Sequence, residues 1–204
     1  MKTKFSALAV AVILTGLLVP ASMRAQDKPA AAPAPAFKVD HNHSTIGFEV
    51  PIMSGLSKVT GKFTDFDVAV DYNEADITKS SVNATIRVAS IDTGIADRDK
   101  DLRSADFFDV DKNPTITFVS HSIEKKDAKH LIAHGTLTMK GVAKEIDLPI
   151  SNAGEFQLPN SPKKIVGFHA AMKLNRRDYG IVWEHQALAT FVGDEVEVVI
   201  DIIN

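Results

Sequence analysis

From about residue 37 onward, apolar and polar residues alternate along much of the chain. In the sequence VNATIRV, for example, Val82, Ala84, Ile86 and Val88 occupy every second position. A period of two places successive side chains on opposite faces of a strand, so that one face is apolar and the other polar. The pattern predicts eight β-strands, near Phe37–Val50, Ser57–Asp71, Ser80–Ile91, Thr115–Glu124, His130–Lys140, Val142–Ser151, Lys163–Leu174 and Gln186–Ile203.

The connections between these segments are mostly short. Such links join neighbouring antiparallel strands, and Met139–Val142 has the length of a tight hairpin. Eight strands with one apolar face must hide that face and two sheet edges, and a closed barrel hides both. We therefore predict an all-β fold, an eight-stranded antiparallel barrel whose interior is filled by side chains or holds one slender ligand.

The period changes in the crossover Ile91–Val110. Ile95, Arg98 and Leu102 lie at positions i, i+3 and i+7, which is one face of a short helix. Asn113-Pro114 then ends any helix and restarts extended chain. This predicts a short helix within the crossover, which packs on the core as a plug or faces a ligand.

Small residues recur among the positions expected to point inward. Ala84, Ala133, Gly135 and Ala170 belong to this group. Small inward side chains leave space, so we expect an apolar interior with room for an apolar ligand or for the helical plug.

The first 25 residues have the pattern of a secretory signal peptide. Lys2 and Lys4 precede the apolar run Ala7–Val19, and small residues follow up to Ala25. The run is shorter than the ~20 residues that a membrane-spanning helix needs. A periplasmic or secreted location is therefore expected, and the absence of cysteine excludes both a disulfide and a lipid anchor on cysteine.

A Pro/Ala-rich tether, residues 26–36, leads into one domain, residues 37–204. The whole chain has 23 basic and 26 acidic residues. Removal of Lys2, Lys4 and Arg24 with the signal peptide leaves 20 basic against 26 acidic residues. This acidic balance argues against nucleic acid or an anionic membrane surface as a general partner.

Metal and catalytic chemistry find little support in the sequence. His41, His43, His134 and His169 fall on predicted strands, but there is no HExxH motif and no cysteine, so we expect no metal site. There is also no GxSxG motif, and we predict no catalytic residue. A hydrolase or other enzyme acting on a lipid-like substrate, and a structural stress scaffold with a filled barrel, remain as alternatives.

Several motifs together resemble the YceI-like family. They are Asp40–Phe48, Val59–Phe66, Ser90–Gly94, Arg98–Ser104, Asp106–Val110, Pro114–Phe118, Gly135–Val142, Asn175–Ile181 and Val192–Val196. The resemblance extends from about Phe37 to Ile203. The family pattern usually has Arg-Ser-Asp-Phe-Gly where this chain has Arg-Arg-Asp-Tyr-Gly, beginning at Arg176.

The resemblance implies a lipocalin-like, elongated barrel that binds a long isoprenoid lipid, such as an isoprenoid quinone or a polyprenyl phosphate, in its interior. It implies transport, storage or stress protection in the periplasm or outside the cell, often as a dimer, without catalysis and without a required cofactor. Transient contact with a membrane is compatible with this role.

On this interpretation apolar residues receive the lipid tail, and arginines in the motif loops face its head group. The alternative for the arginines is a structural one, as ion pairs with neighbouring aspartates that lock the loops. The predicted ligand-binding residues are Phe48, Ile86, Arg98, Leu102, Phe107, Phe108, Ala133, Leu137, Phe168, Arg177 and Trp183.

Overall fold

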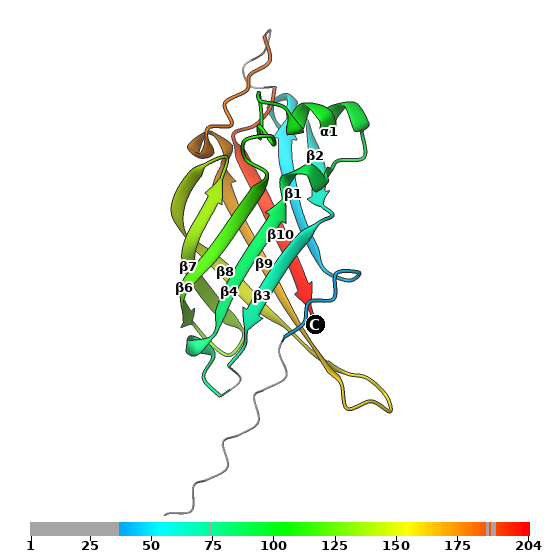
Figure 1. The fold of residues 1–204 in the computed structure, drawn as a ribbon, viewed down its shortest axis with the longest axis vertical. Coiled ribbons are helices and arrows are strands. Elements are labelled where there is room, and N and C mark those ends of the chain that lie inside the picture. Colours follow the sequence, from blue (N-terminus) through cyan, green and yellow to red (C-terminus); the bar gives the residue numbers. More distant parts are fainter. Residues whose placement is uncertain (1–36, 74, 187, 189–190) are drawn as a thin grey trace, which may run out of the picture. The chain divides into compact units, whose positions relative to one another are not determined.

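The computed structural model describes residues 37–73, 75–186, 188 and 191–204. The predicted signal peptide and tether lie outside these residues. The described residues form one antiparallel sheet of ten strands, in the order β3-β4-β6-β7-β8-β9-β10-β1-β2-β5. The sheet is strongly curled into a half-barrel (Figure 1), which confirms the all-β class and the antiparallel pairing.

The strands are β1 (Thr45–Ile52), β2 (Ser57–Phe63), β3 (Phe66–Asp71), β4 (Ser81–Arg87), β5 (Ile91–Asp92), β6 (Thr115–Lys125), β7 (His130–Met139), β8 (Val142–Gln157), β9 (Lys164–Asn175) and β10 (Glu195–Ile203). The helices are the α-helix α1 (Ala96–Arg103) and the short 3-10 helices η1 (Met53–Gly55), η2 (Ile77–Lys79), η3 (Val88–Ser90) and η4 (Arg176–Tyr179). Among the described residues, no helix is long and apolar enough to cross a membrane.

The count of eight strands is corrected to ten, because two predicted strands each bend and continue as a second strand. β2 leads into β3, and β4 leads through η3 into β5. At the bend the Thr64 amide donates to the Ser90 carbonyl at 3.2 Å, and the Arg87 amide donates to the Asp65 carbonyl at 3.0 Å. The two ends of the hydrogen-bonded order, β3 and β5, are therefore direct continuations of β2 and β4.

The hairpin between β7 and β8 confirms the predicted tight turn. Lys140 and Gly141 have φ values of 48° and 76°, and Met139 pairs with Val142 across the turn. Two positive φ values in a row match the right-handed twist of the flanking strands. By contrast, the predicted strand Gln186–Ile203 is too long, because β10 begins at Glu195.

Helix α1 confirms the predicted crossover helix, but its buried face differs from the prediction. Ile95 is 52% exposed, whereas Asp99 is buried. The Asp99 carboxylate accepts from the amide of Thr93 at 2.9 Å and from its hydroxyl at 2.6 Å. Leu102 packs against the core as expected. A polar contact thus fixes the start of the helix, which lies at one end of the sheet (Figure 1).

Two of the small inward residues are covered by neighbouring side chains. Ala133 is fully buried in a cluster with Phe118 and Leu148. A Cβ atom on Gly135 would lie 2.8 Å from the Phe118 ring and 2.4 Å from the Val119 carbonyl oxygen. The expectation that these two positions leave empty space is therefore wrong, because the ring of Phe118 occupies the space over Gly135.

Replacing Gly135 tests this packing. We expect Gly135→Ala to lower the free energy of unfolding by about 1–3 kcal/mol, because the added methyl group overpacks the backbone of β6. Gly167→Ala is the matched control on β9, where the nearest atoms lie 3.4 and 3.5 Å from the added Cβ. Its effect should stay below about 1 kcal/mol in urea unfolding. Equal losses in both variants would contradict the packing argument.

Candidate functional site

An apolar cavity of about 250 Å³ lies against the inward faces of the strands. Its wall consists almost entirely of aliphatic and aromatic side chains, and the alternate residues predicted to face inward supply most of them. β1 contributes Ile46, Phe48 and Val50; β4 contributes Val82, Ala84 and Ile86; β8 contributes Ile146, Leu148 and Ile150; β10 contributes Val196, Val198, Ile200 and Ile202. The strand alternation seen in the sequence therefore builds this wall.

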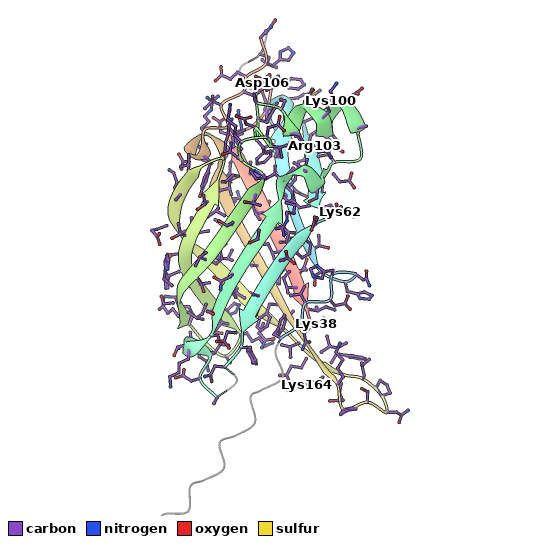
Figure 2. The ribbon with its side chains drawn as sticks, viewed as in Figure 1. Lys38, Lys62, Lys100, Arg103, Asp106 and Lys164 are labelled. Atoms are coloured by element: carbon purple, nitrogen blue, oxygen red, sulfur yellow. The ribbon has the colours of Figure 1, made fainter. Side chains whose placement is uncertain are left out.

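Aromatic residues stand at both ends of the cavity. The ring centroid of Phe168 is 5.8 Å from that of Phe37 and 6.1 Å from that of Tyr72. Phe37 directly precedes Lys38, which Figure 2 shows with Lys164 at one end of the sheet. Lys100, Arg103 and Asp106 mark the opposite end, which carries α1. There Leu102, Phe107 and Phe108 complete the wall. The cavity is thus elongated between two aromatic clusters.

Most of the predicted ligand-binding residues line this cavity. They are Phe48, Ile86, Leu102, Phe107, Phe108, Leu137 and Phe168. Ala133, Arg98, Arg177 and Trp183 are not part of the wall. Trp183 stands behind it, with its ring stacked on Phe107 at a centroid distance of 5.3 Å. The predicted residues that line the cavity are thus all apolar, and their role in binding a ligand stays a prediction.

Two arginines of the crossover make contacts within the loop itself. Arg98 donates to the hydroxyl of Thr93 at 2.7 Å and to its carbonyl at 2.8 Å. Arg103 donates to the carbonyls of Ala89 at 2.9 Å and Ile91 at 2.8 Å. Both guanidinium groups therefore stabilise the backbone conformation of residues 89–93. Their partners are a threonine and backbone carbonyls, not the aspartates that the sequence suggested.

Arg176 is a wall residue that the prediction missed. It is 4% exposed, and it donates to the carbonyls of Ile181 at 2.7 Å and Gly193 at 3.0 Å and to the carboxylate of Asp194 at 2.8 Å. Burial lowers the pKa of its guanidinium, and the charge of Asp194 opposes that shift. An arginine stays charged in proteins, so this buried cation holds the segment that follows η4 over the end of the cavity.

Arg177, which was predicted to bind a ligand, points to other partners. It donates to the carboxylate of Asp194 at 2.7 Å and to that of Glu184. The side chain of Asn175 caps η4 by accepting from the Arg177 amide at 2.9 Å. In a short helix two consecutive side chains point in different directions, so Arg176 faces inward and Arg177 outward. The sequence shows two adjacent arginines and does not show which of them is buried.

Several histidines of the sheet pair with carboxylates. His134 lies 2.7 Å from Asp147 and 3.2 Å from Glu124. These contacts, the hydrogen bond to Asp147 first, raise the pKa of His134 above its ordinary value. Within the described ranges, no group of three or more such side chains is placed to hold a metal ion.

The raised pKa of His134 has a consequence for stability against pH. Its contribution is fully present below the ordinary pKa of 6.5 and is lost as the pH rises through the higher folded-state value. We therefore expect His134→Gln to lower the urea midpoint more at about pH 5.5 than at about pH 8.5. A loss that is equal at both pH values would contradict a charged pair with Asp147.

The buried contacts of Arg176 should contribute more to stability than the exposed ones of Arg177. We expect Arg176→Gln to reduce the free energy of unfolding by about 2–4 kcal/mol, because it leaves buried carbonyls without a donor. Arg177→Gln is the neighbouring control, with an expected loss below about 1 kcal/mol. Urea unfolding of both variants measures the difference. An Arg177→Gln loss as large as that of Arg176→Gln would overturn this assignment.

The sequence and the fold were compared with known proteins. A family model described as the YceI-like domain matches residues 37–203. Protein YceI of Escherichia coli O157:H7 is 38% identical over 152 residues, which cover 74% of this chain and 78% of that protein. A UPF0312 protein of Shewanella baltica is 35% identical over 170 residues, which cover 82% of this chain and 86% of that protein.

Solved structures show the same fold. The YceI protein of Campylobacter jejuni matches with a TM-score of 0.63 at 29% identity, covering 73% of this chain and 85% of that one. BcnA of Burkholderia cenocepacia matches with a TM-score of 0.72 at 24% identity, covering 82% and 99%. A polyisoprenoid-binding domain from Saccharophagus degradans matches with a TM-score of 0.61 at 15% identity, covering 82% and 97%. The match over residues 37–203, together with relatives that share more than a third of their aligned residues, shows that this chain belongs to the YceI-like domain family.

Proposed function

We propose that this protein binds a long isoprenoid lipid in the apolar cavity and serves as a carrier or store for it, without catalysis. The observation that carries the proposal is a cavity of about 250 Å³ whose wall is apolar from one aromatic cluster to the other. The polyisoprenoid-binding domain of Saccharophagus degradans has the same fold and supports the choice of ligand class. The signal-peptide pattern supports a periplasmic or secreted location, and a homodimer stays a prediction.

The chemistry of the cavity wall favours a hydrocarbon ligand. Apolar cavities of ~150 Å³ stay dry and bind small hydrocarbons, and this cavity is larger. In this proposal the curled sheet closes as a barrel around the tail, with the bends between β2 and β3 and between β4 and β5 at the seam. A structural scaffold with a filled interior receives no support, since the wall leaves space that the described side chains do not occupy.

The tail sets capacity and contributes little to selectivity. Each buried CH₂ group is worth ~0.8 kcal/mol against water, and a tail of about forty carbons would exceed the range in which non-covalent affinities saturate. The relevant competitor is a bilayer, which is already apolar. Transfer of the tail from bilayer to cavity is then nearly neutral in free energy, so the head group and the cavity ends decide which lipid is held.

The arginines favour a neutral head group over a charged one. Arg98 and Arg103 are bound to the crossover, and Arg176 and Arg177 are bound to carbonyls and carboxylates near η4. A phosphate would have to displace these partners, each of which would then lack a donor. An isoprenoid quinone needs no such exchange. We therefore infer that a quinone is preferred to a polyprenyl phosphate.

Organic extraction of purified protein, followed by mass spectrometry, tests the ligand class. Protein produced with its signal peptide in a bacterium that makes isoprenoid quinones should yield a quinone at a substantial fraction of one molecule per chain. Polyprenyl phosphate should be absent or minor. An extract without any prenyl species would contradict the proposed function, and an extract in which polyprenyl phosphate dominates would contradict the preference for a neutral head group.

Two adjacent alanines on β9 allow a matched test of the location. Ala170 lines the cavity, whereas Ala171 is exposed on the other face of the strand. We expect Ala170→Phe to reduce the extracted lipid several-fold, because the ring fills space that the tail occupies. Ala171→Phe should retain the occupancy of the unmodified protein. Equal occupancy in both variants would show that the lipid is held elsewhere.

A further inference from the structure

Exposed apolar side chains gather at the end of the sheet that carries α1. Of the seven large apolar residues that are exposed in the described part of the chain, five belong to segments at this end: Met53, Leu56, Ile95, Val182 and Leu188. We call these five residues the apolar rim. The other two, Val119 and Phe156, lie on β6 and on the β8 side of the β8–β9 hairpin. Scattered apolar residues on a surface are ordinary, but a group of them on one end indicates an interaction site.

The rim is held together by contacts between separate segments. The turn after β1 is joined to the segment before β10, because the Met53 amide donates to the Phe191 carbonyl at 2.8 Å and the Gly193 amide donates to the Pro51 carbonyl at 2.8 Å. Figure 1 shows residues 181–186, in orange, at the same end as α1. The rim is therefore a defined feature of the fold.

The backbone of the β1–β2 turn directs one leucine outward. Met53, Ser54 and Gly55 have φ values of 52°, 57° and 87°. Non-glycine residues rarely adopt positive φ, so the chain accepts strain in making this sharp turn. Leu56 follows it and is 85% exposed. A strained turn that ends in an exposed leucine gives the rim a protruding apolar side chain.

Aromatic side chains connect the rim with the cavity. Phe107 belongs to the cavity wall, and Trp183 is stacked on it, next to the exposed Val182. Tryptophan is favoured at membrane interfaces, where its ring meets both apolar and polar surroundings. Apolar surface therefore continues from inside the cavity, through this ring pair, to the rim.

Several charges beside the rim are paired. Glu184 pairs with Arg177, and Asp194 pairs with both Arg176 and Arg177. Lys58, close to the β1–β2 turn, pairs with Glu49. These pairs suit an electrically neutral, apolar partner, and the acidic residues Asp97 and Asp101 of α1, close to Ile95, disfavour an anionic one.

We propose that the apolar rim docks on the surface of a lipid bilayer, so that the ligand passes between bilayer and cavity at the α1 end; this rests on the proposed function. The rim residues stand at loop ends on three separate segments. A bilayer accepts such protruding side chains without a complementary shape, whereas a protein partner would require one. The proposed ligand is dissolved in bilayers, so the protein must contact a bilayer to collect or deliver it.

Vesicle flotation measures the docking directly. The full mature chain is mixed with vesicles of phosphatidylcholine, with and without an octaprenyl quinone. We expect the double variant Leu56→Asp/Val182→Asp to partition at least ~10-fold less than the unmodified protein, because each substitution puts a charge where an apolar side chain would enter the bilayer. Phe156→Asp is the matched control, because Phe156 is 60% exposed and lies outside the rim. It should float as the unmodified protein does, and Leu56→Trp should float more strongly.

A second measurement separates docking from binding. The double variant should take up quinone from detergent micelles as the unmodified protein does, but ~10-fold more slowly from vesicles. Failure of the unmodified protein to take up quinone from either source would contradict the proposed function, while flotation would still decide on docking. Docking is overturned if the unmodified protein does not float, if the double variant floats equally, or if the rim substitutions change only self-association in light scattering.

Discussion

The structure depends on one constraint, which is that the apolar face of a long antiparallel sheet must be hidden from water. The sheet meets it by curling, so that the inward residues of its strands face one another. Ala133 is enclosed by its neighbours in one part of this interior, while Ile86, Leu137 and Ala170 border space. Protein interiors are otherwise close-packed. An apolar space that persists within such a wall is therefore suited to hold an apolar ligand.

Polar contacts secure the end of the sheet where the strands cannot cover the interior. Asp99 holds the start of α1 through Thr93, and Arg176 holds the segment after η4 through carbonyls and Asp194. These groups are buried, so loss of one partner leaves the other without compensation. Helix α1 and the segment after η4 are thus fixed by a few directional contacts, whereas the cavity wall is fixed by many weak apolar contacts. This difference explains why arginines gather in the motif loops although none of them needs a ligand as partner.

Much of the fold could be predicted from the sequence because strand alternation reports which side of a sheet is buried. The inward sets on β1, β4, β8 and β10, the turn at Lys140 and the crossover helix follow from local pattern alone. The bends that divide two predicted strands were missed, although the alternation shifts by one residue at the first of them, from Phe63 on the inward face of β2 to Phe66 on that of β3. The residues of the candidate site also fall into those that the sequence indicates and those that it does not. Phe107 and Leu137 were found from their apolar character, but the choice of Arg176 over Arg177 depends on how η4 orients two identical side chains.

The free energy of moving the tail between bilayer, water and cavity connects the proposed ligand, the cavity and the apolar rim. A long tail leaves a bilayer for a cavity at little net gain, so a carrier that first released the lipid into water would face the whole hydrophobic penalty of the tail. Direct contact between the cavity end and the bilayer removes that step. The ring pair Phe107–Trp183 offers such a path, because one ring belongs to the wall and the other lies beside the exposed Val182. A neutral head group is favoured for the same reason, since it can pass along an apolar path without breaking the arginine contacts beside it.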